Sequence, residues 1–251
     1  MGQGAPVEQA RPRGGEGTIS RIQLQAKGEG ITNFGGYDLA IDHSLPAWIK
    51  ITPPALRVHE TSKVQEFLIR SLDITGASLI LLLTTPVMLI ISIFIKVLSP
   101  GPILYKQERV GKKGRVFMLY KFRSMIDGAE KQVGPIWAAK DDGRVTSIGK
   151  VMRKVRIDEL PQLFNILKGD MSLVGPRPER PFFVRRHKAL QGVRLEVKPG
   201  LTGLAQIRAF YDLKPEHKLK YDYLYIQNRS LLLNLSILLK TIPVVIRKTG
   251  W

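Results

Sequence analysis

The sequence predicts a mixed α/β protein that is predominantly helical and attached to a membrane by one apolar segment. Three observations lead to this fold class. An uncharged run is long enough to cross a bilayer core, a proline lies near its middle, and basic residues flank both of its ends. Short strand-like runs and further helical segments follow it in more polar sequence. We therefore expect a monotopic membrane protein with a re-entrant helix–break–helix anchor and interfacial helices.

The composition limits what the protein can bind and which chemistry it can perform. The chain has 251 residues, which is room for one domain of ordinary size plus a tail. Its 39 Lys and Arg against 21 Asp and Glu give a net charge of +18, so an anionic partner is expected: nucleic acid, a membrane surface or a phosphorylated substrate. The absence of Cys excludes disulfides, thiol catalysis and cysteine-ligated zinc, and four scattered His argue against a His-rich metal centre.

Changes in composition divide the chain into four regions. Residues 1–36 are rich in Gly and polar residues and predict a flexible tail, without the apolar core of a signal peptide. Residues 37–65 are broken by prolines and receive no role. Residues 66–98 form the predicted anchor, and residues 99–251 form a cytoplasmic domain with interfacial helices.

The anchor prediction depends on residues 74–95, which contain no charged side chain. As a helix they would reach roughly 33 Å, enough to cross a bilayer core. A buried helix of a soluble domain is the alternative, although such helices are seldom apolar on every side. Thr85-Pro86 would bend the helix, and threonine hydroxyls can bond the freed carbonyls. Basic residues at both ends favour a hairpin whose two ends are both cytoplasmic. A single span across the membrane remains the alternative.

Beyond the anchor, several short segments carry recognisable local signals. Residues 103–105 and 116–122 read as strands around the basic turn 111–114. A helix is expected over 160–167, ending at Gly169. Residues 231–246 are apolar and predict either a core helix or one in the membrane interface.

Several basic residues stand beside Gly, Pro or turns instead of along a helical stripe. A solvated basic surface is the ordinary explanation for any one of them. However, the prolines on either side of Arg177 restrict its backbone, and a stiffly held Arg suits bidentate binding of phosphate oxygens. Nucleic-acid binding would require interleaved aromatic residues, which this proline-rich segment lacks. The residues that share this setting are Lys121, Arg123, Arg144, Arg153, Arg156, Arg177 and Arg180.

Asp158-Glu159 is the most informative acidic pair. Asp158 fits the N-cap of the predicted helix and Pro161 its first turn, so helix capping alone could explain the aspartate. Adjacent residues on a helix do not face each other, which would allow the two carboxylates different roles. Neighbouring arginines would keep Asp158 ionised, as a nucleophile or a Mg²⁺ ligand. The residue types alone do not decide between capping and chemistry.

Three motifs in order resemble the bacterial sugar transferase family, the monotopic polyprenyl-phosphate phosphoglycosyl transferases. They are IKVLSPGPILYKQERVGKKGRVFMLYKFRSM, DDGRVTSIGKVMRKVRIDELPQLFNILKGDMSLVGPRPERP and VKPGLTGLAQI. The resemblance runs from about residue 64 to the C-terminus, and Thr85-Pro86 holds the place of the family's anchor break. Asn234 departs from the family pattern, in which Asp is expected.

The resemblance implies transfer of a sugar 1-phosphate from a UDP-sugar to undecaprenyl phosphate, with release of UMP. Asp158 would be the nucleophile that forms a phosphosugar–aspartyl intermediate, and Glu159 would support it through metal or proton handling. Mg²⁺ at Asp158 would offset the diphosphate charge. The implied phosphate-binding residues are Arg153 and Arg177 first, then Lys121, Arg123 and Arg144.

The resemblance also implies a place and a set of partners. The domain would act at the cytoplasmic face of the bacterial inner membrane, among membrane lipids and without nucleic acid, and would most resemble members that start exopolysaccharide assembly. Two other functions remain open from the residues: a non-catalytic basic membrane adaptor, and a hydrolase of diphosphates using the same carboxylates. Neither the sugar nor the oligomeric state is predicted.

Overall fold

The structure, a computed structural model, describes residues 33–34, 37–38, 61–130, 134, 142–208 and 215–246. The predicted tail (1–36) and extension (37–65) therefore lie almost entirely outside the described residues. From them the structure describes one antiparallel pairing, of β1 (Asn33–Phe34) with β2 (Tyr37–Asp38), and the first turn of a long helix. Every described residue belongs to one compact unit, Thr32–Trp251.

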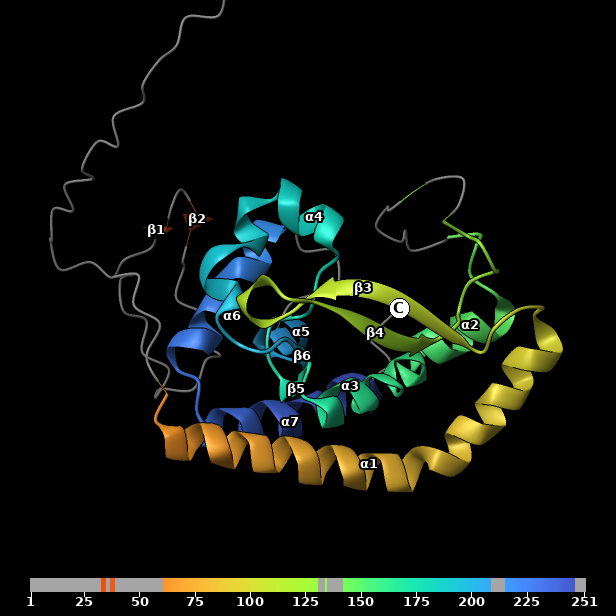
Figure 1. Cartoon of the computed structure of the whole chain (residues 1–251), viewed down its shortest axis with the longest axis horizontal. Helices are drawn as coiled ribbons and strands as arrows, with labels where there is room; N and C mark the ends of the chain where they lie inside the picture. The colour runs from red at the N-terminus through yellow and green to blue at the C-terminus, as the bar shows by residue number, and fades with distance from the viewer. Residues whose placement is uncertain are drawn as a thin grey trace, which may run out of the picture. The chain divides into compact units, whose positions relative to one another are not determined.

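Helices make up most of the described part of the chain, which confirms the predicted mixed α/β class (Figure 1). The strands form pairs and not a continuous sheet. The remaining elements, in chain order, are α1 (Lys63–Leu98), β3 (Leu104–Val110), η1 (Lys112–Gly114), β4 (Val116–Phe122), α2 (Ser147–Lys154), η2 (Ile157–Glu159), α3 (Gln162–Lys168), β5 (Ser172–Val174), α4 (Pro181–Arg186), η3 (Lys188–Leu190), η4 (Gly192–Leu195), β6 (Gly200–Thr202), α5 (Leu204–Arg208), α6 (Pro215–Gln227) and α7 (Leu231–Ile246).

The apolar segment folds as one continuous helix, α1, which corrects the predicted helix–break–helix. Pro86 lies inside it, and Figure 1 shows the helix turning upward in its yellow C-terminal part. The hydroxyls of Thr84 and Thr85 donate to the carbonyls of Ile80 (2.7 Å) and Leu81 (2.6 Å). Proline and threonine back-bonding are established causes of helix bending, so the chain bends here without interrupting the helix.

The N-terminal half of α1 is attached to the domain by polar contacts as well as by packing. The Asp73 carboxylate is buried and accepts hydrogen bonds from the Ser172 hydroxyl and the Leu173 amide, both at 2.8 Å. Arg70 donates to two carbonyls at the C-terminal end of α3, where the helix leaves such groups without partners inside the helix. These contacts give α1 one fixed rotation, with Asp73 towards β5.

The C-terminal end of α1 returns to the same domain. Ile95 is fully buried and packs with Phe122 of β4 and Met152 of α2. The Arg123 guanidinium donates to the carbonyls of Ser99 (2.6 Å) and Pro100 (2.8 Å), directly after the helix ends. Both ends of α1 therefore contact one packed unit.

The two predicted strands pair antiparallel around η1, and β4 has the predicted bounds. β3 extends to Val110, well beyond the predicted residues 103–105, because it pairs with β4 along its whole length. β5 and β6 form a parallel pair beside it, with Ser172 opposite Gly200. A Cβ on Gly200 would lie 2.0 Å from the Gly175 nitrogen, so only glycine allows the backbones to approach this closely. This close contact brings the segment after β5 next to the one before β6.

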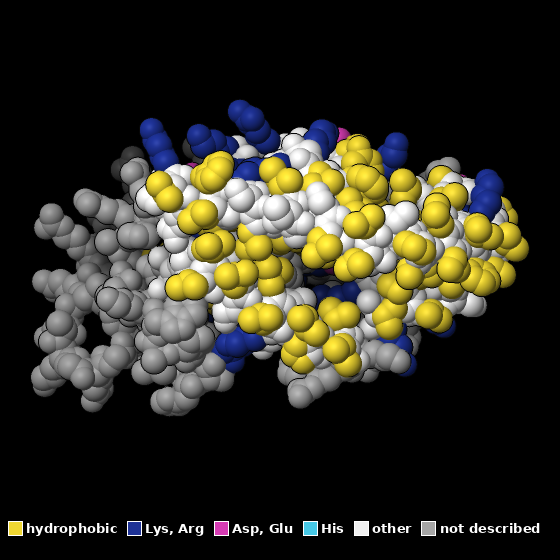
Figure 2. All heavy atoms as spheres, turned by 90° about the horizontal axis from the view of Figure 1, so that it is seen from below, with side chains coloured by type: hydrophobic (Ala, Val, Ile, Leu, Met, Phe, Trp, Pro, Cys, Tyr) yellow, Lys and Arg dark blue, Asp and Glu magenta, His cyan; other side chains and the backbone are white. Residues whose placement is uncertain are grey.

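One face of the described unit is strongly apolar. Seen from the side of α1 and α7, hydrophobic side chains spread over much of the surface (Figure 2). Only a small part of the apolar stretch of α1 is buried within the described unit, so most of this helix lies outside the core, which fits membrane association. α7 buries Leu233, Asn234 and Ile237 while exposing Leu239 and Ile246. The two alternatives for residues 231–246 are thus not exclusive, because one side of α7 packs in the core and the other joins the apolar face.

Candidate active site

The acidic pair lies in a short connection between two helices. α2 ends at Lys154, and Arg156 follows in the left-handed conformation with φ 57°. This unusual backbone for a non-glycine residue turns the chain into η2, which carries Asp158 and Glu159. α3 then begins at Gln162, with Pro161 in the N-cap position. The prediction that Asp158 caps this helix is therefore wrong, because the aspartate belongs to the preceding 3₁₀ turn.

Glu159 is buried and held by two cations from distant segments. Arg177 donates to both of its carboxylate oxygens, at 2.5 and 3.4 Å, and the Lys121 ammonium lies 3.6 Å away. Burial alone would raise the pKa of Glu159, but the charges of Arg177 and Lys121 hold it well below its ordinary value. Glu159 is therefore a fixed anion, with both oxygens occupied by Arg177.

Asp158 has a different environment although it is the adjacent residue. It is 7% exposed, and among the described residues its carboxylate has no hydrogen-bond or ion-pair partner. Burial and the charge of Glu159 raise its pKa, while Lys121 and other cations oppose this. The expectation that neighbouring arginines simply keep Asp158 ionised needs correction, because Arg177 is bonded to Glu159. A desolvated carboxylate without a partner is more basic than one in water.

Three of the five predicted phosphate-binding residues lie near this pair. Lys121, Arg153 and Arg177 each act electrostatically on Asp158. Arg153 is oriented by a 3.0 Å hydrogen bond from its Nε to the Ser124 hydroxyl. These residues come from β4, α2 and the segment after β5, so the fold collects the cations around a 3₁₀ turn.

The structure places the other two predicted residues in different contacts. Arg123 is 4% exposed and holds the carbonyls at the end of α1, as described above. Arg144 is bonded to Asp142, with Nε–Oδ1 and Nη2–Oδ2 distances of 2.8 and 2.5 Å. Neither guanidinium contacts the acidic pair in the part of the chain that the structure describes.

Keeping the Lys121 side chain charged costs free energy, because the ammonium is largely removed from water. Burial lowers its pKa from 10.5 to about 8, a shift that Glu159 opposes and the nearby Arg177 reinforces. A lysine with this pKa is still mostly charged at neutral pH but changes charge within the range of ordinary assays.

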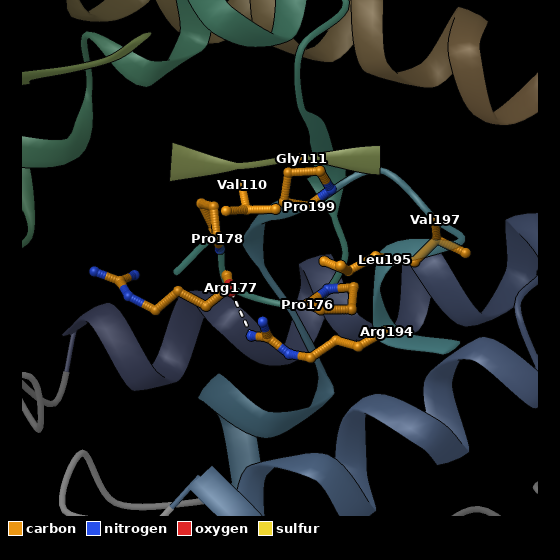
Figure 3. Close-up of a pocket in the computed structure, with 9 residues that line it drawn as sticks. All are labelled: Val110, Gly111, Pro176, Arg177, Pro178, Arg194, Leu195, Val197 and Pro199. Carbon is orange, nitrogen blue, oxygen red and sulfur yellow. Dashed lines mark hydrogen bonds between the residues drawn. The ribbon is translucent and has the colours of Figure 1, made fainter. Parts of the chain in front are cut away.

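A small pocket adjoins the backbone of Arg177 and is lined by prolines and apolar side chains from β3, η4 and the segment before β6 (Figure 3). The Arg177 side chain extends away from the other lining residues, while its carbonyl accepts a hydrogen bond from Arg194. Two residues further along the chain, Glu179 lies between Arg109 and Lys218, at 3.7 Å from each. The sequence interpretation missed these supporting charges, for which no local motif is visible.

Few carboxylates are available here for a metal ion. Among the described residues, no group of three or more His, Cys, Asp or Glu side chains could enclose one. Mg²⁺ in phosphoryl-transfer sites commonly uses one or two carboxylates and completes its shell with substrate phosphate and water. Asp158, whose oxygens form no ion pair with any described residue, meets that smaller requirement, whereas both oxygens of Glu159 are bonded by Arg177.

A buried carboxylate pair among cations, in a domain with an apolar face, defines a class of site suited to phosphorylated substrates near a membrane. Comparison with known proteins gives the family. The chain belongs to the bacterial sugar transferase family, whose model matches residues 64–248.

Individual relatives support the assignment. The chain is 45% identical over 195 residues to UDP-N-acetylgalactosamine-undecaprenyl-phosphate N-acetylgalactosaminephosphotransferase of Aeromonas hydrophila, covering 75% of this chain and 46% of that protein. It is 43% identical over 178 residues to UDP-glucose:undecaprenyl-phosphate glucose-1-phosphate transferase of Klebsiella pneumoniae, covering 68% of this chain and 38% of that protein. It is 37% identical over 195 residues to the exopolysaccharide production protein ExoY of Rhizobium meliloti, covering 72% and 86%. The chain thus spans less than half the length of the first two relatives and most of the third.

Proposed function

We propose that this protein transfers a sugar 1-phosphate from a UDP-sugar to undecaprenyl phosphate, releases UMP, and so initiates the assembly of a polysaccharide, specifically an exopolysaccharide. The Aeromonas and Klebsiella relatives are named for this type of transfer, and ExoY for exopolysaccharide production. The observation that carries the proposal is the buried Asp158 carboxylate. It has no ion-pair partner among the residues that the structure describes, whereas both oxygens of the adjacent Glu159 are bonded by Arg177.

In the first half-reaction, Asp158 acts as the nucleophile. One carboxylate oxygen attacks the β-phosphorus of the UDP-sugar, and the bond from that phosphorus to the bridging oxygen breaks as UMP leaves with the bond's electron pair. Lys121 and Arg153 lie near enough to influence the charge of Asp158 and would hold phosphate oxygens there. Mg²⁺, held by Asp158 and the diphosphate, would offset negative charge when bound.

In the second half-reaction, an oxygen of undecaprenyl phosphate attacks the phosphorus of the aspartyl intermediate. The acyl phosphate bond breaks, the Asp158 carboxylate is restored and the diphosphate-linked lipid product leaves. Glu159 keeps its charge throughout, because Arg177 and Lys121 stabilise the anion. We therefore assign it the orientation of Arg177 and Lys121, and not proton transfer.

We further propose that α1 enters the cytoplasmic leaflet and returns, so that the domain lies on the cytoplasmic face. A straight 36-residue helix would extend about 54 Å and carry one end away from the domain. Here Ala77 and Ile95 both pack into the core of the same unit. Because the chain has no native cysteine, single cysteines at Lys63 and Leu98 can test this topology. Both should resist an impermeant maleimide in intact cells and react after lysis, whereas a single span would expose one of them.

The reaction is tested by incubating detergent-solubilised protein with Mg²⁺, undecaprenyl phosphate and a panel of UDP-sugars. We expect UMP release from one or two donors, and its loss in Asp158→Asn. Asp170→Asn is the matched control, because Asp170 is a partly exposed carboxylate paired with Lys168 outside the site. Activity that survives in Asp158→Asn contradicts the mechanism.

The covalent intermediate separates this function from the alternatives. With donor and without lipid, the protein should gain the mass of one phosphosugar, and hydroxylamine should remove it from the peptide containing Asp158. Labelled UMP should then exchange into the UDP-sugar, as ping-pong kinetics require. A hydrolase would release UMP at the same rate with or without lipid. An adaptor would neither release UMP nor form the covalent intermediate.

A further inference from the structure

The backbone that carries Arg177 is held by two arginines from other parts of the chain. Arg194, from η4, donates through Nη2 to the Arg177 carbonyl. Arg109, from β3, donates through Nη1 to the next carbonyl, that of Pro178, at 2.9 Å. The two flanking carbonyls are bonded by backbone amides, from Gly200 to Pro176 and from Val110 to Glu179, both at 2.9 Å. Four consecutive carbonyls are therefore fixed by groups outside the segment.

Each arginine has its own buried counter-charge. Arg194 and Asp222 are both 3% exposed in their side chains, and the Arg194 Nε lies 2.7 Å from the Asp222 Oδ2. Arg109 lies 3.7 Å from the Glu179 carboxylate, which Lys218 approaches at the same distance. Buried charges are tolerated only with such pairing, so both guanidinium groups are confined to one position.

These contacts leave the Arg177 side chain little choice of direction. The prolines on either side restrict the backbone further. The Arg177 side chain points away from the other residues around the pocket (Figure 3), and its guanidinium bonds Glu159. A long side chain on a mobile loop would lose much more rotational freedom on making the same bidentate contact. Arg194 and Arg109 thus help to determine where the Arg177 guanidinium lies relative to the acidic pair.

We propose that Arg194 and Arg109 are positioning residues for phosphosugar transfer, which hold the Arg177 backbone by its own and the following carbonyl and so aim its guanidinium at Glu159. The expected effect on kcat rests on the proposed function. The expected effect on the order of the Arg177 backbone rests on the hydrogen bonds alone. Neither arginine contacts the acidic pair. The charge of Arg109 also acts on Lys121, but Arg→Lys variants keep this charge, so their effect on turnover should pass through Arg177.

A double-mutant cycle tests this dependence. Arg194→Lys keeps the charge opposite Asp222 but cannot also reach the Arg177 carbonyl, so kcat for UMP release should fall about tenfold with little change in KM. Arg177→Lys should reduce kcat by about a hundredfold. The double variant should be no slower than Arg177→Lys alone, because the intermediary is already lost. Losses that multiply would overturn the proposal.

The structural consequence is measured separately by hydrogen exchange. In Arg194→Lys, amides of residues 175–180 should exchange faster, while α3 and the β3–β4 hairpin keep their protection. Arg229→Lys is the matched control, since it alters a partly buried ion pair with Glu66 far along the chain, and it should change neither the exchange of this segment nor kcat. Unchanged exchange in residues 175–180 would overturn the proposal.

Two further outcomes are distinguishable. If Arg194→Lys unfolds, exchange rises everywhere, and Arg109→Lys, which retains the charge beside Glu179, tests the second contact by the same cycle. If no donor releases UMP from the wild-type protein, the proposed function fails. The exchange experiment then still decides whether the two arginines hold the segment.

Discussion

Lys121 leads to a strong prediction about pH, because its side chain is only 18% exposed and its ammonium lies 3.6 Å from the Glu159 carboxylate. Its pKa falls from 10.5 to about 8, a difference of about 2.5, so keeping the charge inside the protein costs about 3 kcal/mol relative to water. A lysine with a pKa near 8 is about 90% charged at pH 7 and about 10% charged at pH 9. If the charged form is needed to hold Glu159 and the substrate phosphate, UMP release should fall nearly tenfold over this interval.

The direction follows from the depressed pKa. A lysine is active here when protonated, so activity is present below pH 8 and lost as the pH rises through it. In Lys121→Arg the side chain stays charged across the assay range, and the alkaline decline should move above pH 10. The shape of the profile is compared, and not the absolute rate, because the larger guanidinium will also alter the geometry.

The assay is the initial rate of UMP release at saturating donor and lipid from pH 6 to pH 10, with constant ionic strength. Lys150→Arg is the matched control, since Lys150 is exposed on α2, and its profile should equal that of the wild type. A decline that keeps its midpoint near pH 8 in Lys121→Arg would refute the assignment of this pKa to activity. A flat wild-type profile to pH 10 would refute the requirement for the charged form.

The remaining predictions concern stability and membrane attachment. Leu163→Ala, at a fully buried core position, should lower the free energy of unfolding by about 2–5 kcal/mol in thermal or denaturant melts, and a loss below 1 kcal/mol would contradict the packing described. Gly149→Ala would place a Cβ 2.0 Å from the Ser124 carbonyl oxygen and should cost about 1–3 kcal/mol by the same measurement, whereas an unchanged melt would mean that α2 shifts freely. Burial raises the pKa of Glu179, but nearby arginines and Lys218 lower it overall, so its stabilising contribution is present above pH 4.5 and is lost on acidification. Glu179→Gln should therefore melt at a lower temperature at pH 7, and its melting temperature should depend less on acid pH. An acid dependence as steep as that of the wild type would contradict this sign. Leu89→Lys adds a charge to an exposed position of α1 and should reduce the carbonate-resistant membrane fraction without changing the core, so an unaltered fraction would argue against insertion of this face.

Local signals in the sequence were sufficient for much of the fold. β4 begins and ends where alternation and turn residues place it, at Val116 and Phe122. The end of α3 was also predictable, because Gly169 adopts φ 96° as its left-handed C-cap and only glycine does this without strain. Even the bend of α1 follows from proline and threonine in one helix, although the continuation of the helix beyond Pro86 does not.

The candidate site was predictable as a set of residue types but not as a set of contacts. Arg123 and Arg177 share a similar setting in the sequence, yet one bonds the end of α1 and the other bonds Glu159. Their partners are 24 and 18 residues away in the sequence, so only tertiary packing decides which groups meet. Asn234 shows the same limit: it departs from the expected Asp, and in the fold its buried oxygen accepts a hydrogen bond from Tyr225 at 3.0 Å.

The bent apolar helix has a consequence for how such a protein would meet its lipid substrate. With α1 embedded as proposed, protein and lipid share a surface, and their encounters depend on the number of lipid molecules per unit area. If the bulk concentration of the lipid acceptor is held constant, adding inert phospholipid or detergent would lower its surface density and slow the reaction. The natural concentration scale for the lipid acceptor is therefore its mole fraction in the bilayer, whereas the sugar nucleotide is counted per litre.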